Sequence, residues 1–131
     1  MREALSELLD RVDGGIAIAL ADRDGLLIEG ISKRRLDLEA AVAEHAALLR
    51  EAQAAYARSL GSPGLEELLV SGQGIMGYAR LYPASKDQAA LFLLFLLAPG
   101  GNLGQARLQA GRFLETLAKE AVWRTSRPSK P

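Results

Sequence analysis

The hydrophobic pattern is clearest in residues 16–21, where Ile16, Ile18 and Leu20 alternate with three alanines. Successive side chains of a strand point to opposite faces, so a strand over these residues is apolar on both faces and needs cover on both. The turn sequence DRDG follows, and after it comes a second apolar stretch, residues 26–29. This arrangement is typical of a β-hairpin. The hairpin therefore predicts a sheet whose centre is buried on both sides.

Three other stretches have helical patterns. Residues 3–12 place leucines at helical spacing. Residues 36–60 contain no proline or glycine and are rich in alanine, which predicts a long helix. The last helix begins after Asn102, whose side chain can cap it, with Gln105 three places on. Its apolar stripe consists of Leu103, Ala106, Ala110, Phe113, Leu114, Leu117 and Ala121.

The stretch between the middle and last helices predicts three more strands. Residues 65–70 have helical propensity as well, but a segment so short between two glycine-rich turns makes a poor isolated helix. The turn sequence SGQG joins them to a strand that ends before Pro83, and residues 83–87 form a loop. Residues 89–98 are a continuous apolar run. Periodicity alone cannot separate strand from helix there, but the run's length and the PGG sequence favour a buried strand.

These elements predict an α+β fold with a five-stranded antiparallel sheet. The first and fifth strands are apolar on both faces and belong at the centre. The other strands carry charged residues, so one of their faces can be partly exposed to solvent. Hairpin connections then give the strand order 2-1-5-4-3, with the third strand on an open edge. The long middle helix covers one face and the two terminal helices cover the other. We expect one domain over residues 1–123 and a disordered basic tail over residues 124–131.

The composition argues against several classes of function. The chain has 131 residues, which fit one domain, and its sixteen basic and sixteen acidic residues cancel, so no net charge attracts nucleic acid or an anionic membrane. It has no cysteine, which removes thiolate chemistry and zinc–thiolate sites and suits a reducing cytoplasm. The longest apolar run, residues 89–98, is shorter than the roughly 20 residues of a membrane-spanning helix. We expect a cytoplasmic protein with no nucleic acid partner and no membrane insertion.

The sequence contains no motif that predicts catalysis. A P-loop is absent, and the sequence GGNLGQAR before the last helix is better explained as a strand-to-helix turn than as an anion site. His45 is the only histidine and lies on the apolar side of the middle helix, where a packed histidine is expected rather than a metal ligand. Glu66 and Glu67 point to opposite faces of their predicted strand, which is wrong for two carboxylates that share one substrate. We therefore expect no enzyme activity, no catalytic residue, no cofactor and no metal.

The middle helix has two apolar sides. The bulky side should face the sheet and consists of Leu38, Val42, His45, Leu49, Ala52 and Tyr56. The opposite side carries what we call the alanine ridge: Ala40, Ala43, Ala47 and Ala54. Alanine on an exposed helix face can reflect helix propensity alone, but small residues also allow a second helix to approach closely.

The open edge strand lies beside the alanine ridge. An unpaired edge next to a helix with a small-residue face predicts a twofold interface, in which two third strands pair and two middle helices cross. The predicted interface residues are Ala40, Ala43, Ala47, Ala54, Leu65, Glu67 and Leu69.

Several of these features together resemble a known family. The hairpin IAIALADRDGLLIEG, the long helix after it, the apolar fifth strand and the sequence GNLGQARLQ at the start of the last helix resemble the Roadblock domain family, which includes dynein light chains and bacterial MglB proteins. The resemblance covers roughly residues 3–121 and consists of apolar patterns and glycines, not a chemical signature. The short connection ISKRR and the basic tail depart from the family pattern.

The resemblance implies a homodimer whose sheet continues through the paired third strands. It also implies a non-catalytic regulator or scaffold of a small Ras-like GTPase, as in MglB-like members, which act without supplying a catalytic arginine of their own. The charged residues that flank the alanine ridge would then form a platform for the GTPase, although charged helix faces are also often simply solvated. The predicted partner-binding residues are Glu39, Glu44, Arg50, Glu51 and Arg58.

A second hypothesis is a small-ligand sensor module of the related profilin-like or PAS-like fold. Such a module needs a cavity between helix and sheet that contains a few convergent polar groups. Tyr78, Tyr82 and His45 are the main candidates, because few other polar residues are predicted to point inward. The positions of these three side chains distinguish the two hypotheses.

Overall fold

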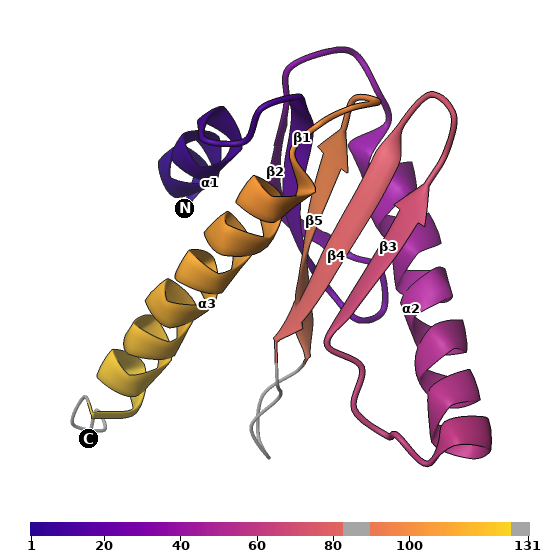
Figure 1. Ribbon diagram of the computed structural model, residues 1–131. Helices are drawn as coiled ribbons and strands as arrows, with labels where there is room; N and C mark the ends of the chain where they lie inside the picture. Colours follow the sequence, from indigo (N-terminus) through magenta and orange to yellow (C-terminus); the bar gives the residue numbers. More distant parts are fainter. Residues whose placement is uncertain (83–89, 127–131) are drawn as a thin grey trace.

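A computed structural model describes residues 1–82 and 90–126, with side chains up to Leu117. The predicted loop at residues 83–87 and most of the predicted tail lie outside the described residues, and the last helix includes residues 124–126 of that tail. Figure 1 shows the elements, which are α1 (Arg2–Asp10), β1 (Gly15–Asp22), β2 (Leu27–Ser32), α2 (Leu38–Leu60), β3 (Glu67–Ser71), β4 (Met76–Tyr82), β5 (Leu91–Leu97) and α3 (Leu103–Ser126).

The five strands form one antiparallel sheet in the order β2-β1-β5-β4-β3, which confirms the predicted fold class and strand order. The two strands that are apolar on both faces, β1 and β5, lie next to each other at the centre. Their register pairs Ile18 with Phe95 and Leu20 with Leu93. Every residue from Ile16 to Ala21 is buried, as a centre covered on both sides requires. The edge strands are β2 and β3.

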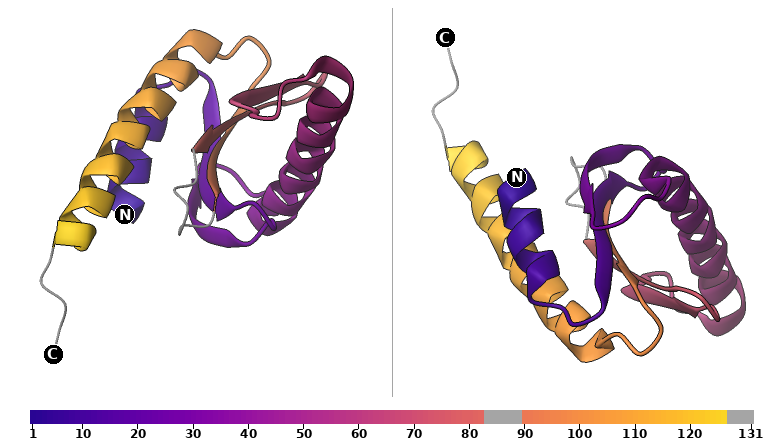
Figure 2. Two further views of the ribbon diagram at one scale, coloured as in Figure 1. Left: turned by 90° about the horizontal axis from the view of Figure 1, so that it is seen from below. Right: turned by 90° about the horizontal axis from the view of Figure 1, so that it is seen from above.

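The helices cover the sheet on opposite faces, as predicted. Figure 2 shows α1 and α3 side by side on one face and α2 on the other, with the sheet curved around α2. The α1/α3 side forms a core around the largest buried side chains of that face, which include Ile18, Tyr78 and Phe95. The α2 side packs Val42, Ala46 and Leu49 against small strand residues and Phe92. The alanines of β1 face α2, so the helix can approach the sheet closely.

Local sequence signals set the ends of the helices. The side chain of Asp37 caps α2 by accepting a hydrogen bond from the backbone N–H of Ala40 at 3.0 Å. At the other end Gly61 adopts φ 62°, a left-handed conformation that glycine takes at little cost and that commonly ends helices. Asn102 caps α3 as predicted, because its Oδ1 accepts from the N–H of Gln105 at 3.0 Å.

Several details differ from the sequence predictions, including the bounds of the first and middle helices and of the fifth strand. The third strand begins at Glu67, not at residue 65, so Leu65 and Glu66 belong to the connection after α2. Tyr56 was expected to face the sheet, but it is 47% exposed because the last turns of α2 extend past the end of β3 (Figure 1). Hydrophobic periodicity gives the direction of a side chain on a helix, but it does not tell where the sheet beneath ends.

His45 fixes how α2 lies on the sheet. Its Nδ1 is 2.7 Å from the carbonyl oxygen of Ala41, one turn earlier on the helix. Its Nε2 faces Gly77 of β4, where a Cβ atom would overlap the imidazole ring. His45 is therefore the packed histidine that the sequence predicts, and Gly77 is needed for close approach of helix and strand.

We expect Gly77→Ala to lower the free energy of unfolding by about 1–3 kcal/mol, because the added methyl group must displace the His45 ring. Urea denaturation checks this value. Gly74→Ala is the matched control, because a Cβ there meets no atom within 4 Å. The double variant His45→Ala, Gly77→Ala should recover part of the loss, since the ring is then absent. Equal effects of the two glycine substitutions would show that the His45 contact does not matter for stability.

Candidate functional site

The alanine ridge faces solvent along its whole length. Ala40, Ala43, Ala47 and Ala54 are all exposed, while Val42, Ala46 and Leu49 on the opposite side are buried. Ala43 and Ala46 also lie against Gly25 in the turn between β1 and β2. The structure therefore orients α2 as the sequence predicts, with bulky residues inward and small residues outward.

One flank of α2 carries an apolar side chain that the sequence predictions missed. Leu48 is 45% exposed. His45, three residues earlier, lies against β4, whereas Ala43 and Ala46 lie against the turn between β1 and β2. Since residues three apart share a side of a helix, Leu48 lies on the flank of α2 that is directed toward β4 and the edge strand β3.

The edge strand β3 presents exposed apolar side chains on both faces of the sheet. Val70 is 40% exposed and lies opposite Gly77, on the α2 side, whereas Leu69 is 44% exposed and lies opposite Tyr78, on the α1/α3 side. β3 pairs only with β4, so its other backbone edge has no strand partner among the described residues. Leu65, which the sequence predicts at the interface, is half-buried against the core on the α2 side. The α2 flank and the open edge of β3 together form what we call the α2/β3 surface: Leu48, Val70 and the alanine ridge.

Glu67, the other predicted interface residue, is held within the subunit. Its carboxylate accepts hydrogen bonds from the Tyr78 hydroxyl at 2.6 Å and from the Arg80 guanidinium at 3.5 Å, and it forms a hydrogen-bonded ion pair with Arg107 of α3. Glu67 and Arg107 are 40 residues apart in sequence, so only the folded chain brings them together. This cluster ties the edge strand to α3, and it leaves the backbone edge of β3 open.

The cluster shifts the ionisation of its members. Burial would raise the pKa of Glu67, but the hydrogen bonds from Tyr78 and Arg107 and the charges of Arg107 and Arg80 outweigh it and hold that pKa below its ordinary value. Burial, together with the hydrogen bond to the negative Glu67, raises the pKa of Tyr78 to about 12. Glu67 is therefore ionised and Tyr78 is neutral at physiological pH.

The predicted partner-binding residues are all exposed on the outer half of α2. Glu44, Glu51 and Arg58 follow one another on the β3 side of the alanine ridge, and Glu39 and Arg50 lie on its other side. Arg50 is not entirely free, because its guanidinium donates a hydrogen bond to the carbonyl oxygen of Arg23 at 2.8 Å. The structure therefore places these residues on the two sides of the alanine ridge and anchors Arg50 to the turn between β1 and β2.

The polar residues of the sensor hypothesis do not converge. Tyr78 and Tyr82 belong to the core on the α1/α3 side, whereas His45 lies on the α2 side of the sheet. A pocket of about 440 Å³ is lined by Tyr82, Arg23, Gln53 and neighbouring residues, but His45 and Tyr78 do not line it. The Tyr82 hydroxyl already donates to the carbonyl oxygen of Ala110 at 3.2 Å. This geometry gives the sensor hypothesis little support.

Two further features are absent among the described residues. They contain no group of three or more histidine, cysteine, aspartate or glutamate side chains that could hold a metal ion. Among the described helices none is both long enough and apolar enough to cross a membrane. What remains is a surface suited to contact with proteins, built from α2 and β3.

Comparison with known proteins agrees with this architecture. The model of the Roadblock/LC7 domain matches residues 1–90, which is more than half of the chain. The chain belongs to the Roadblock/LC7 family. No curated protein sequence matches the chain.

Solved structures of this family have the same fold. A Roadblock/LC7 domain from Streptomyces avermitilis is 13% identical with a TM-score of 0.79, and the alignment covers 93% of this chain and 98% of that one. The gliding protein MglB of Thermus thermophilus is 22% identical with a TM-score of 0.72, over 90% of this chain and 88% of that one. An MglB structure with a tetrameric arrangement is 24% identical with a TM-score of 0.72, and the alignment covers 89% of this chain and 84% of that one.

We expect Glu67→Gln to lower the stability at pH 7 by about 1 kcal/mol, because a neutral amide cannot form the ion pair with Arg107. The folded-state pKa of Glu67 is depressed, so its stabilisation is present above the unfolded pKa and is lost as the pH falls through the folded pKa. The difference between wild type and variant should therefore shrink as the pH falls below about 4.5, the ordinary glutamate value.

Urea denaturation at a series of pH values checks this prediction. Glu66→Gln is the control, because Glu66 is an exposed neighbour outside the cluster's hydrogen bonds and should change stability by less than about 0.5 kcal/mol. A Glu67→Gln deficit that stays constant from neutral to acidic pH would contradict the role of the carboxylate charge.

Proposed function

We propose that this protein is a homodimeric, non-catalytic regulator or scaffold of a small Ras-like GTPase, of the MglB type, in the cytoplasm. The observation that carries the proposal is the α2/β3 surface, where an open strand edge lies beside exposed apolar side chains and the alanine ridge. Membership of the Roadblock/LC7 family and the fold shared with MglB support it. An MglB structure in the same fold has a tetrameric arrangement, which fits association through surfaces of this fold.

In the proposed dimer the β3 strands of two subunits pair antiparallel and extend the sheet. Leu48 and Val70 become buried on the α2 side of the extended sheet, and Leu69 packs on its other side, which gives the interface apolar contacts on both faces. The two α2 helices then run beside each other through the flank that carries Leu48 and the adjoining alanine ridge. Glu67 stays in its own subunit, held by Arg107, and contributes through its backbone.

The GTPase is proposed to rest on the outer faces of the two α2 helices, in contact with both subunits. The platform has mixed charge, with Glu39, Glu44 and Glu51 beside Arg50 and Arg58. Charged rims set the encounter rate and specificity more than the affinity, which comes from a buried centre. The proposed effect is to hold or bias the conformation of the GTPase.

We expect the protein to have about twice its chain mass of 14.0 kDa at tens of micromolar, measured by multi-angle light scattering. Leu48→Glu should weaken the dimer at least about tenfold, since it buries an unpaired charge. Leu108→Glu is the control, because Leu108 is 54% exposed on α3, outside the α2/β3 surface. A monomeric wild type would overturn the proposed dimer. A larger effect of Ala47→Glu than of Leu48→Glu would shift the helix contact onto the alanine ridge.

We expect the double variant Arg50→Glu, Arg58→Glu to slow association with a Ras-like GTPase from the same organism at least about threefold while the dimer persists. Stopped-flow or biolayer kinetics with the GTPase loaded with GDP or a GTP analogue measures this. Arg112→Glu is the control, because Arg112 is exposed on α3. Unchanged kinetics would place the GTPase off α2. No binding of the wild type in either nucleotide state would remove this GTPase as the partner.

A further inference from the structure

The second edge of the sheet, β2, is as open as β3. β2 pairs with β1 on one side and ends the strand order, so its outer backbone edge has no strand partner in the part of the chain that the structure describes. α1 and α2 contact β2 from the two faces of the sheet. A sixth strand added here would continue the sheet between those two helices. A dimer formed through β3 leaves this edge exposed at the outer ends of its sheet.

Two apolar side chains at the start of β2 are more exposed than the apolar side chains of the other edge strand, β3. Leu26 is 67% exposed and Ile28 is 51% exposed, compared with 44% for Leu69 and 40% for Val70 on the β3 side. The pairing of β1 with β2 is irregular here, because Leu20 lies opposite Glu29 and Ala21 opposite Leu27, which leaves Ile28 without a partner residue on β1. A bulge of this kind redirects a side chain. Ile28 is thus held at the surface by backbone geometry.

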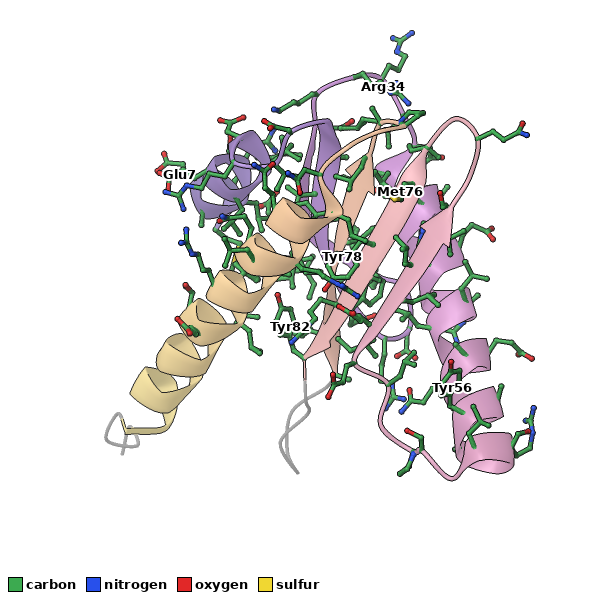
Figure 3. The ribbon with its side chains drawn as sticks, viewed as in Figure 1. Glu7, Arg34, Tyr56, Met76, Tyr78 and Tyr82 are labelled. Carbon is green, nitrogen blue, oxygen red and sulfur yellow. The ribbon has the colours of Figure 1, made fainter. Side chains whose placement is uncertain are left out.

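The other end of β2 is basic. Lys33, Arg34 and Arg35 follow the strand directly and are all exposed. Lys33 pairs with Asp10 at 3.2 Å, whereas Figure 3 shows Arg34 reaching into solvent from the connection above the sheet. The Ser32 hydroxyl donates a hydrogen bond to the Arg34 carbonyl oxygen, which holds the start of this connection. The strand covers roughly 13 Å from Ile28 to Ser32, and the chain then bends at residues 33 and 34.

We propose that β2 is a docking edge for an extended segment of another protein, which carries apolar side chains at one end and carboxylates at the other. The backbone of the segment would pair with β2 as a sixth strand. Its apolar side chains would cover Leu26 and Ile28, and its carboxylates would pair with Arg34 and Arg35. In the antiparallel direction used throughout this sheet, the carboxylates come before the apolar residues in the segment.

A second copy of this chain is a poor occupant of the same edge. Two β2 strands related by a twofold axis would pair antiparallel, which places Arg34 and Arg35 of one copy near Leu26 and Ile28 of the other. Cations would then lie against apolar side chains, and the carboxylates that the basic end requires would be missing. Charge complementarity therefore favours a different protein, whose segment is acidic where β2 is followed by arginines.

The test is selection of peptides from a random display library on the full-length protein, with peptides of about twelve residues, long enough to span the edge. The selection is repeated on two double variants. One removes the apolar end (Leu26→Ser, Ile28→Ser), and the other reverses the charge of the basic end (Arg34→Glu, Arg35→Glu). Leu108→Ser is the control for loss of an exposed leucine elsewhere. We expect wild type to enrich peptides with an acidic cluster before apolar residues. These peptides should bind each double variant at least about tenfold more weakly and the control unchanged.

Backbone pairing has its own readout. N-methylation of alternate peptide residues removes the donors on one edge of a strand, so one of the two alternate sets should abolish binding and the other should not. Four outcomes would overturn the proposal. The selected peptides could bind either double variant as tightly as wild type, or tolerate both methylated sets equally. The selection could also enrich peptides without acidic residues, or enrich no peptides at all. A smaller particle mass for Leu26→Ser with Ile28→Ser than for wild type would overturn it as well, since a second copy would then occupy the edge. The readouts do not depend on a GTPase, so failure here leaves the proposed function untouched.

Discussion

Strands β1 and β5 bury apolar side chains on both of their faces, and a sheet with such a centre is stable only when helices cover both sides. The remaining architecture follows from this requirement. The terminal helices close one face and α2 closes the other, and the alanines of β1 leave room for α2 to lie close. The strands with mixed polarity take the outer positions, because their charged side chains cannot be buried on both faces without partners.

A sheet arranged in this way has two edges, and the chain treats them differently. β3 carries Val70 on the α2 side, toward the flank with Leu48, and Leu69 on the α1/α3 side, which suits pairing of two identical subunits, and the carboxylate of Glu67 ties this strand to β4 and α3. β2 carries an apolar pair at one end and two exposed arginines at the other, which is a pattern that a twofold copy of itself does not complement. Open strand edges invite association, so differences in their side chains decide which partner each one accepts.

Much of the architecture was predictable from the sequence. The two-faced apolar pattern of residues 16–21 identifies a central strand, and the hairpin turns then leave one strand order. The cap Asn102 acts within three residues of itself, so it was predicted directly, whereas the middle helix was predicted from residue 36 and begins after its cap Asp37. The outward position of the alanine ridge also followed from helical periodicity alone.

The tertiary structure decided the features that depend on two elements meeting. Periodicity places Leu48 beside the ridge, but only the packing of His45 on Gly77 shows that this flank is directed toward the edge strand. In the same way only the folded chain brings Arg107 of α3 to Glu67, and Ile28 is exposed because the register of β1 and β2 slips by one residue. The sequence determines which way side chains point from their own element, because that depends on backbone repeat alone. Which surfaces meet depends on register and on the rotation of one element against another, and these are set by packing across the whole chain.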